Sequence, residues 1–396
     1  MDLSKLREKA AAHFKTAGFP TTREELWRFT DVSVMANRTF SDAWNTSDLE
    51  FEPLGRIVLV FENGRLSSRK SSFADLPGGV RIGSVMDRVD PRLGTLADAQ
   101  SAFVAANTAY FSDGVYIEVD EGVELDQPIH LVYLADVEGA AFHLRNFMSC
   151  GRNARLTVVE EYLGRAETTY WTNAVTEVFV DDGGWVDHYK IQRESRTAYH
   201  FQTLEANLGA KAVFSNHAVT IGSALGRNDI RGKLTGEGGE AICNGLYLLK
   251  DRQHFDTHMF MDHAVAKCNS HELYKGILDE KSRAVFCGRI LVQQDAQQTD
   301  AIQSNKNLLL SRTAKINTLP QLEIYADDVK CTHGATVGQL DEQALYYLQT
   351  RGIDPVDGHA MLTFAFANEV LDEVKCSAAK THIENMVQEW LSGVSA

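Results

Sequence analysis

The N-terminal end of the chain has the spacing of apolar residues that an amphipathic helix requires. Leu3, Leu6, Ala10 and Phe14 recur at intervals of three or four residues. Gly18 follows, and a glycine just beyond a periodic run is a common stop signal. A first helix is therefore predicted up to this glycine.

Three further elements are expected before the middle of the chain. The segment 21–25, Thr-Thr-Arg-Glu-Glu, predicts the capped start of a second helix because an acid follows a threonine by three residues. A strand pair is expected over 56–66, around the turn sequence Glu-Asn-Gly. The Ala-rich stretch 93–111 is expected to be helical.

The pattern changes between about 112 and 335, where short β-rich runs follow one another without a helical period. Clear examples are 114–119, 129–134, 154–159 and 175–180. A weak sequence echo recurs through this region, mostly at steps of roughly 25 to 31 residues. Such spacing is typical of a solenoid in which each coil holds two or three strands.

A β-sandwich or a large barrel is the alternative to a solenoid here. The solenoid is favoured because the β-rich runs continue for so long with no helix between them. Asn305, Asn307 and Asn317 also recur where turns are expected, and stacked asparagines can satisfy backbone groups from coil to coil. The pattern therefore predicts a mainly β fold, a parallel β-helix.

The C-terminal end returns to helices. Asp341 predicts the cap of one helix that ends at Gly352, and Asp354-Pro355 predicts the start of the next. A last helix is expected over 377–391, and these helices are expected to cover the open end of the solenoid. The predicted organisation is a mainly helical region over 1–111, a β-helix core over 112–338 and a helical region over 339–396.

Charge and hydropathy narrow the range of partners and locations. The 396 residues include 54 acidic and 39 basic side chains, a net charge of -15, which argues against nucleic acid or an anionic membrane as the main partner. No stretch approaches the roughly 18–20 apolar residues of a membrane span, and the start lacks the apolar core of a secretory signal. A cytoplasmic location with six free thiols is expected.

Two short patterns were tested as functional motifs. The segment 226–234 resembles a phosphate-binding loop, but it has one residue too many between its glycines, and Leu234 replaces the magnesium-binding hydroxyl. Any ATP would then be bound by another chain. His254, Asp256 and His258 would share one face of a strand, yet their spacing matches no tight metal motif, so structural histidines are the more ordinary reading.

Cys331 and His333 give a sharper signal. On an extended strand, positions two apart project to the same side, so the thiol and the imidazole would lie side by side. Both groups suit iron and sulfur chemistry, and the histidine would lower the thiol pKa if it were charged. The alternative is a buried cysteine beside a hydrogen-bonded histidine.

Longer stretches carry a family resemblance. The segments 286–299, 303–311, 317–338 and 345–353 resemble the shared signature of the SufB/SufD family of iron–sulfur cluster assembly scaffold proteins. Within that family the chain resembles the SufD branch. It is short, it lacks clustered N-terminal cysteines, and it has His-Gly-Ala-Thr from position 333.

The resemblance implies a right-handed parallel β-helix between helical ends, and a non-catalytic scaffold. It implies pairing with SufB through the β-helix, with a nascent iron–sulfur cluster held transiently at the shared interface and no resident cofactor in the isolated chain. The histidine implicated at that interface falls on His333 and the neighbouring cysteine on Cys331, and these two are the candidate cluster ligands. The resemblance also implies that SufC, an ABC-type ATPase, binds the C-terminal helices, for which the candidates are Leu345, Leu348, Arg351 and Gly352.

Three other functions stay open from the sequence. One is a SufB-like scaffold that pairs with itself, so that the isolated chain forms a homodimer. Another is a purely structural partner that only completes the dimer. The third is a β-helix enzyme that acts on polysaccharide, although such enzymes are commonly secreted.

Overall fold

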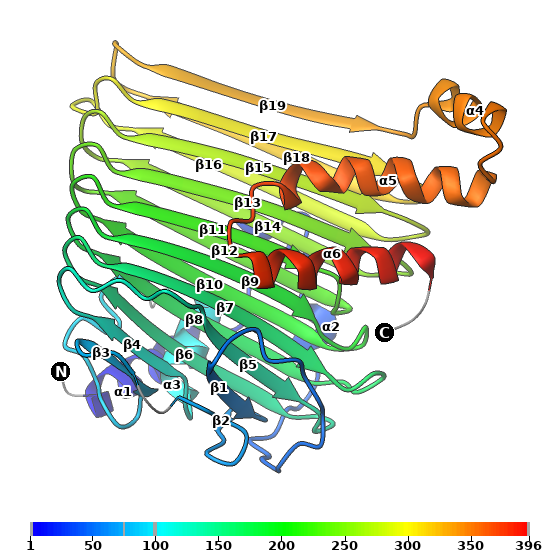
Figure 1. Cartoon of the computed structure of the whole chain (residues 1–396). Helices are drawn as coiled ribbons and strands as arrows, with labels where there is room; N and C mark the ends of the chain where they lie inside the picture. The colour runs from blue at the N-terminus through cyan, green and yellow to red at the C-terminus, as the bar shows by residue number, and fades with distance from the viewer. Residues whose placement is uncertain (1–2, 74–75, 98–100, 394–396) are drawn as a thin grey trace.

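Two facing sheets run along most of the computed structural model, which describes residues 3–73, 76–97 and 101–393 (Figure 1). One sheet has ten strands in the order β19-β17-β15-β13-β11-β9-β7-β5-β1-β2, and the other has nine in the order β18-β16-β14-β12-β10-β8-β6-β4-β3. From β4 onward, odd-numbered and even-numbered strands alternate between the sheets, as in a flattened solenoid. The mainly β fold with a parallel β-helix and helices towards both termini is confirmed.

The strands have the following bounds: β1 Ile57–Glu62, β2 Arg65–Leu66, β3 Val80–Ser84, β4 Val115–Val119, β5 Ile129–Ala135, β6 Ala141–Cys150, β7 Arg155–Gly164, β8 Trp171–Val180, β9 Trp185–Arg193, β10 Tyr199–Leu208, β11 Val213–Thr220, β12 Leu225–Leu234, β13 Glu240–Leu249, β14 His254–His263, β15 Asn269–Leu278, β16 Arg283–Val292, β17 Asp300–Leu309, β18 Lys315–Ile324 and β19 Lys330–Gly338. The helices are α1 Leu3–Ala17, η1 Glu25–Trp27 (a 3₁₀ turn), α2 Ser33–Ala36, α3 Ala102–Tyr110, α4 Glu342–Thr350, α5 Pro355–Leu371 and α6 Ser377–Ser392.

Each coil places its strands in direct register on the coil before. Trp185 pairs with Val213, Val213 with Glu240, and Glu240 with Asn269, so one coil takes about 30 residues. Side chains alternate between the lumen and the outside. The lumen-facing apolar residues form the main core, which continues through the whole solenoid.

The expected asparagine ladder at the corners is wrong. Asn305 and Asn307 lie inside β17 with their side chains buried in the lumen, and Asn317 lies in β18. They bond to lumenal partners, since Asn307 Nδ2 donates to Asn305 Oδ1 at 2.7 Å. Buried amides are stable there because a partner satisfies them.

The N-terminal predictions hold in part. α1 ends before Gly18, and β1 and β2 form the expected hairpin around Asn63 and Gly64, both at positive φ. The second predicted helix forms only the single turn of η1. The predicted helix over 93–111 is confirmed only as α3, because 93–97 forms turns and 98–100 lies outside the described residues.

The helices α4 and α5 begin where their caps predict, and α6 begins at Ser377 without a side-chain cap. The side chain of Asp341 accepts from Gln343 N, and that of Asp354 accepts from Val356 N. Their expected position over the open end is wrong: α5 and α6 lie along the outer face of the ten-stranded sheet (Figure 1). The apolar contact there joins Tyr189, Ile191, Val219, Leu246, Leu248 and Ile277 of the sheet to Val370, Ile383, Val387 and Trp390.

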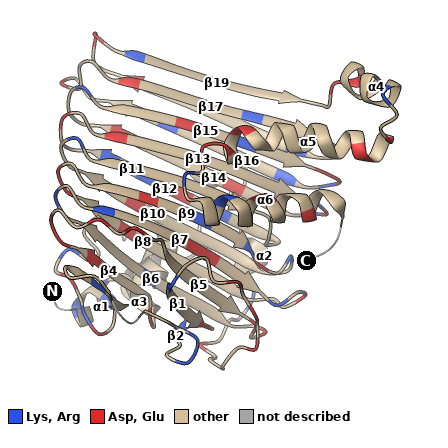
Figure 2. Ribbon diagram, in the orientation of Figure 1, with Lys and Arg blue, Asp and Glu red and all other residues tan. Residues whose placement is uncertain are grey.

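Acidic and basic residues are interspersed along the visible coils (Figure 2). In the parts of the chain that the structure describes, none of the helices is long and apolar enough to cross a membrane.

Candidate functional site

The last strand, β19, carries both residues of the predicted site. It hydrogen-bonds to β17 on one side and ends the ten-stranded sheet on the other. Nearly all of its residues are exposed, whereas the strands one or two coils earlier are mostly buried. The site therefore lies at an open end of the solenoid (Figure 1).

Cys331 and His333 project from β19 to the same, lumenal side. Cys331 pairs in register with the buried Ala301 and is half-buried against the main core. His333 pairs with the buried Gln303 but is itself exposed. The predicted side-by-side arrangement is present in the backbone register, and the imidazole stands at the mouth of the lumen.

Below His333 the lumen is polar. Gln303 Nε2 donates to Glu272 Oε2 at 2.6 Å, and Glu272 is in register with Cys243 of the next coil inward. Burial raises the pKa of Glu272 to about 7. The amide of Gln303 therefore lies one coil inward from His333, and the carboxyl of Glu272 lies two coils inward.

The thiol of Cys331 does not have the activation suggested from the sequence. Burial, followed by the charge of Asp300, raises its pKa. A neighbouring imidazolium would shift it in the opposite direction. Burial therefore opposes ionisation of the Cys331 thiol.

The histidines of β14 do not form a metal cluster. His254, Asp256 and His258 point outward, while His263 points into the lumen and bonds to Ser270 Oγ at 2.9 Å. Across residues 3–73, 76–97 and 101–393, no three His, Cys, Asp or Glu side chains are grouped as metal ligands. The segment 226–234, which resembles a phosphate-binding loop, lies within the regular strand β12.

The four candidates for ATPase binding lie on and after α4. Leu345 and Leu348 are half-buried and face Gly358 of α5. Arg351 is exposed, and its Nη2 donates to Tyr347 Oη at 3.0 Å. Gly352 takes positive φ after the helix. The helix α4 stands away from the solenoid (Figure 1).

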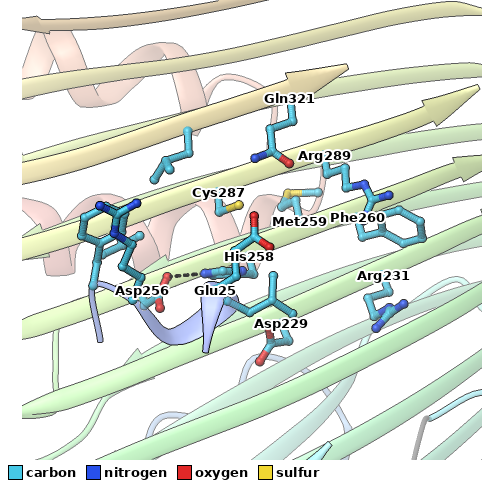
Figure 3. Close-up of a pocket in the computed structure, with 15 residues that line it drawn as sticks. Glu25, Asp229, Arg231, Asp256, His258, Met259, Phe260, Cys287, Arg289 and Gln321 are labelled. Atoms are coloured by element: carbon cyan, nitrogen blue, oxygen red, sulfur yellow. Dashed lines mark ion pairs between the residues drawn. The ribbon is translucent and has the colours of Figure 1, made fainter. Parts of the chain in front are cut away.

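The sequence predicted that Asp256 and His258 share one face of a strand, but not that Cys287 lies beside them. On the outside of the nine-stranded sheet, His258 of β14 lies in register with Cys287 of β16, next to Asp256 (Figure 3). The two are far apart in sequence, so no short motif contains them. Aligning the chain on its coil period of about 30 residues would have brought them together.

Comparison with known proteins agrees with the architecture. The family described as "SUF system FeS cluster assembly, SufBD core domain" matches residues 133–366, and the family described as "SufBD protein N-terminal region" matches residues 2–131.

Individual relatives match along nearly the whole chain. The chain is 31% identical to the iron–sulfur cluster assembly protein SufD of Escherichia coli, over 95% of this chain and 90% of that protein. It is also 31% identical to an iron–sulfur cluster assembly SufBD family protein of Synechocystis, over 96% of this chain and 89% of that protein. A SufBD family protein of Mycobacterium tuberculosis is 25% identical over 94% of this chain and 89% of its own length. The chain therefore belongs to the SufBD family of iron–sulfur cluster assembly proteins and is SufD-like.

Proposed function

We propose that this chain is a non-catalytic scaffold subunit that pairs with SufB through its open final coil and supplies a ligand to a nascent iron–sulfur cluster there. One observation carries the proposal: all residues of the last strand except the half-buried Cys331 are exposed, and the strand presents His333 at the mouth of the lumen. A second β-helix stacked on this end would complete the hydrogen bonding of the edge and enclose the imidazole.

The composition of β19 supports a covered edge. Exposed edge strands usually carry charges or prolines that prevent pairing. The nine residues of β19 have one charge, Lys330 at the first position, and no proline (Figure 2). Val337 is 50% exposed on this strand. Such an edge is suited to a permanent partner strand.

The ligand role follows from the chemistry of the site. A neutral imidazole binds iron, and a thiol that is protonated when alone becomes a ligand once a metal displaces its proton. His333 is the principal ligand in this proposal, and Cys331 a secondary one. The cluster is cargo, formed between the two subunits and then passed on.

The energy input would come from the ATPase partner, SufC. The hairpin of α4 and α5 is its proposed docking element, because α4 has no buried residue and exposes Tyr346 and Tyr347. Closure of two ATPase subunits would pull on this hairpin in each scaffold chain. Because Lys275 Nζ donates to Phe366 O of α5 at 2.7 Å, the pull would reach the coils near the open end.

Substitution of His333 tests the ligand role. In a complex reconstituted anaerobically with SufB and SufC, His333→Ala is expected to abolish cluster formation, followed by the visible absorption of the cluster, while the complex still assembles. Thr332→Ala changes the adjacent, outward-facing residue and is expected to keep the full yield. An undiminished yield in His333→Ala would remove the ligand role and leave only a structural partner.

A charge reversal tests the docking element. Arg351→Glu is expected to lower retention of SufC in a pull-down by at least about tenfold, since an exposed charge at an interface rim contributes to association. Arg56→Glu, an exposed arginine near β1, is the matched control. Equal retention by both variants would exclude this end of α4 as the contact.

Self-pairing is the second candidate function, because the same open end could stack on a copy of itself. The molecular mass of the chain, measured with and without SufB, separates the two: a homodimer that persists in the presence of SufB favours the SufB-like scaffold.

A further inference from the structure

A pocket of about 280 Å³ lies on the outside of the nine-stranded sheet, away from the lumen and from Cys331 and His333 (Figure 3). Strands β12, β14, β16 and β18 form its floor, and the segment from Glu25 to Phe29 forms a wall. This volume is close to the lower limit of small-molecule pockets. The floor holds the half-buried thiol of Cys287.

His258 and Cys287 lie side by side on this floor. They are register partners on the neighbouring parallel strands β14 and β16, and both side chains face outward. Parallel strands lie about 4.8 Å apart, so side chains at paired positions touch. The imidazole also forms an ion pair, since His258 Nε2 lies 3.1 Å from Asp256 Oδ1. The order is thiol, imidazole, carboxylate.

The carboxylate is rigidly held. Asp256 is 1% exposed, and its Oδ2 accepts from Thr30 Oγ1 at 2.6 Å and from Arg227 Nη1 at 3.0 Å. The guanidinium of Arg227 is fixed in turn by Asp229, by Leu26 O and by the ring of Trp27, 3.9 Å away. A fixed acid orients the imidazole, the arrangement that activates nucleophilic cysteines.

We propose that Cys287, with His258 as its charge partner and Asp256 as the orienting acid, is a reactive thiol site for small molecules that contain a sulfur–sulfur bond. The site is separate from the cluster-ligand role proposed for His333 and does not depend on it.

The reaction needs no outside oxidant. The Cys287 thiolate attacks one sulfur of R–S–S–R′, a new bond forms between Sγ and that sulfur, and the original sulfur–sulfur bond breaks. The electron pair leaves with R′–S⁻, which takes up the proton held by His258. With a persulfide R–S–SH, attack on the terminal sulfur transfers that sulfur to Cys287 and releases R–SH.

The electrostatics favour this chemistry at neutral pH. Burial lowers the pKa of His258, but the charge of Asp256 outweighs it and raises the pKa to about 9. The other charged groups that face the imidazole are Arg227 and Asp229 on β12 and Glu25 of the wall, with the Cys287 thiol on β16. His258 is therefore an imidazolium beside the sulfur, in a position to give its proton to the departing thiolate.

The walls suit a small organic sulfur compound with polar ends. Leu26, Phe29, Val285 and Leu319 provide apolar contact, and the rim has two guanidiniums, Arg231 and Arg289, on either side of the Phe260 ring at 5.1 and 5.3 Å. Each guanidinium already has a carboxylate partner, Glu205 or Glu323. The rim is thus polar without a large net charge, which fits a zwitterionic peptide thiol.

The test uses the full chain with glutathione disulfide in one arm and glutathione persulfide in the other. Site-resolved mass spectrometry gives the rate of modification at each cysteine. At pH 7, Cys287 is expected to react in at least one arm about ten times faster than Cys376, which is also half-buried but lies on the α6 side of the molecule. The arm that reacts identifies the sulfur source.

The variant His258→Gln separates activation from simple exposure. It is expected to slow Cys287 about tenfold at pH 7 with no change at Cys376. The pH profile at Cys287 is expected to differ between the wild type and the variant, because the variant lacks the charge of His258. Equal rates at Cys287 and Cys376 in both arms, or an unchanged rate and pH profile in the variant, would overturn the proposal.

Discussion

At the scale of single residues, glycines decide how the lumen is filled. A Cβ atom at Gly276 would lie 2.1 Å from Cε2 of Tyr247 and 2.5 Å from Oδ1 of Asn307. The space lets the tyrosine ring of β13 lie over Gly276 of β15 and reach β17 in the same sheet, where Tyr247 Oη donates to Asn307 Oδ1 at 2.5 Å. Asn305 Nδ2 donates to the same Tyr247 oxygen at 3.2 Å. Glycine is therefore required at position 276 for packing and not for a turn conformation.

The variant Gly276→Ala is expected to lower the free energy of unfolding by about 1–3 kcal/mol, because a methyl group forces the buried ring and amide apart. Chemical denaturation followed by far-UV circular dichroism measures it. Gly334→Ala is the matched control, since a Cβ there meets no atom within 4 Å, and a change below about 0.5 kcal/mol is expected. Equal effects of the two substitutions would contradict the packing argument.

At the scale of elements, α6 is held to the solenoid by polar contacts as well as by its apolar face. Tyr189 Oη accepts from the backbone N–H groups of Lys375 and Cys376 at the start of the helix, at 3.2 and 3.1 Å. Further along, His382 Nε2 lies 2.8 Å from Glu161 Oε1. Glu161 is fully buried and also contacts His130 and Arg193.

Neutralising Glu161 should release this helix. Burial raises its pKa, but hydrogen bonds from His130 and His382 outweigh that and hold the pKa well below its usual range. Because the folded pKa is below the unfolded one, the stabilisation is complete above the unfolded value of about 4.3 and is lost as pH falls below it. Glu161→Gln is expected to destabilise the fold by about 2–4 kcal/mol at neutral pH and to flatten the acid side of the stability curve.

Hydrogen exchange of the peptide 377–392 measures the release of α6. The denaturation midpoint from pH 3 to 8 measures the loss of stability and its pH dependence. Glu389→Gln removes an exposed carboxyl from the same helix and is expected to change neither the hydrogen exchange nor the denaturation midpoint. Unchanged exchange in Glu161→Gln would show that the apolar contact alone holds α6.

At the scale of the whole molecule, the two ends of the solenoid differ. At the N-terminal end the sheets finish with β2 and β3, which pair antiparallel with β1 and β4 and so stop the coil pattern. At the other end β19 presents a long, almost uncharged edge. This asymmetry limits growth by stacking to one end and is the physical basis of the proposed pairing.

A charge placed on that edge should prevent pairing. Val337→Lys is expected to lower the affinity for SufB by at least about tenfold, because a lysine on an edge strand opposes strand addition. The stability of the isolated chain should change little, since Val337 is half exposed. Co-purification and analytical ultracentrifugation measure the affinity for SufB. Chemical denaturation measures the stability of the isolated chain.

Val34→Lys, at a 61% exposed position in α2, is the matched control for added charge and is expected to pair normally. Pairing of Val337→Lys with unchanged affinity would place the interface elsewhere on the molecule.

Local signals in the sequence determined the ends of helices and the coil period. Gly18, Asp341 and the Asp354-Pro355 pair act within one turn of backbone, so their effect can be read without knowing the rest of the chain. The spacing of the β-rich runs predicted a solenoid, since each coil repeats the same path. The two-residue alternation of side chains along a strand placed Cys331 and His333 on one side of β19.

Only the tertiary structure decided which residues face the lumen and which strands are neighbours. A shift of one residue moves a side chain from inside to outside, and packing of the whole coil sets that choice. Asn305 and Asn307 are therefore lumenal and not at corners, α5 and α6 cover a side and not the end, and His258 meets Cys287. Such contacts join positions a full coil apart, where the sequence carries no local hydrogen bond or cap to reveal them.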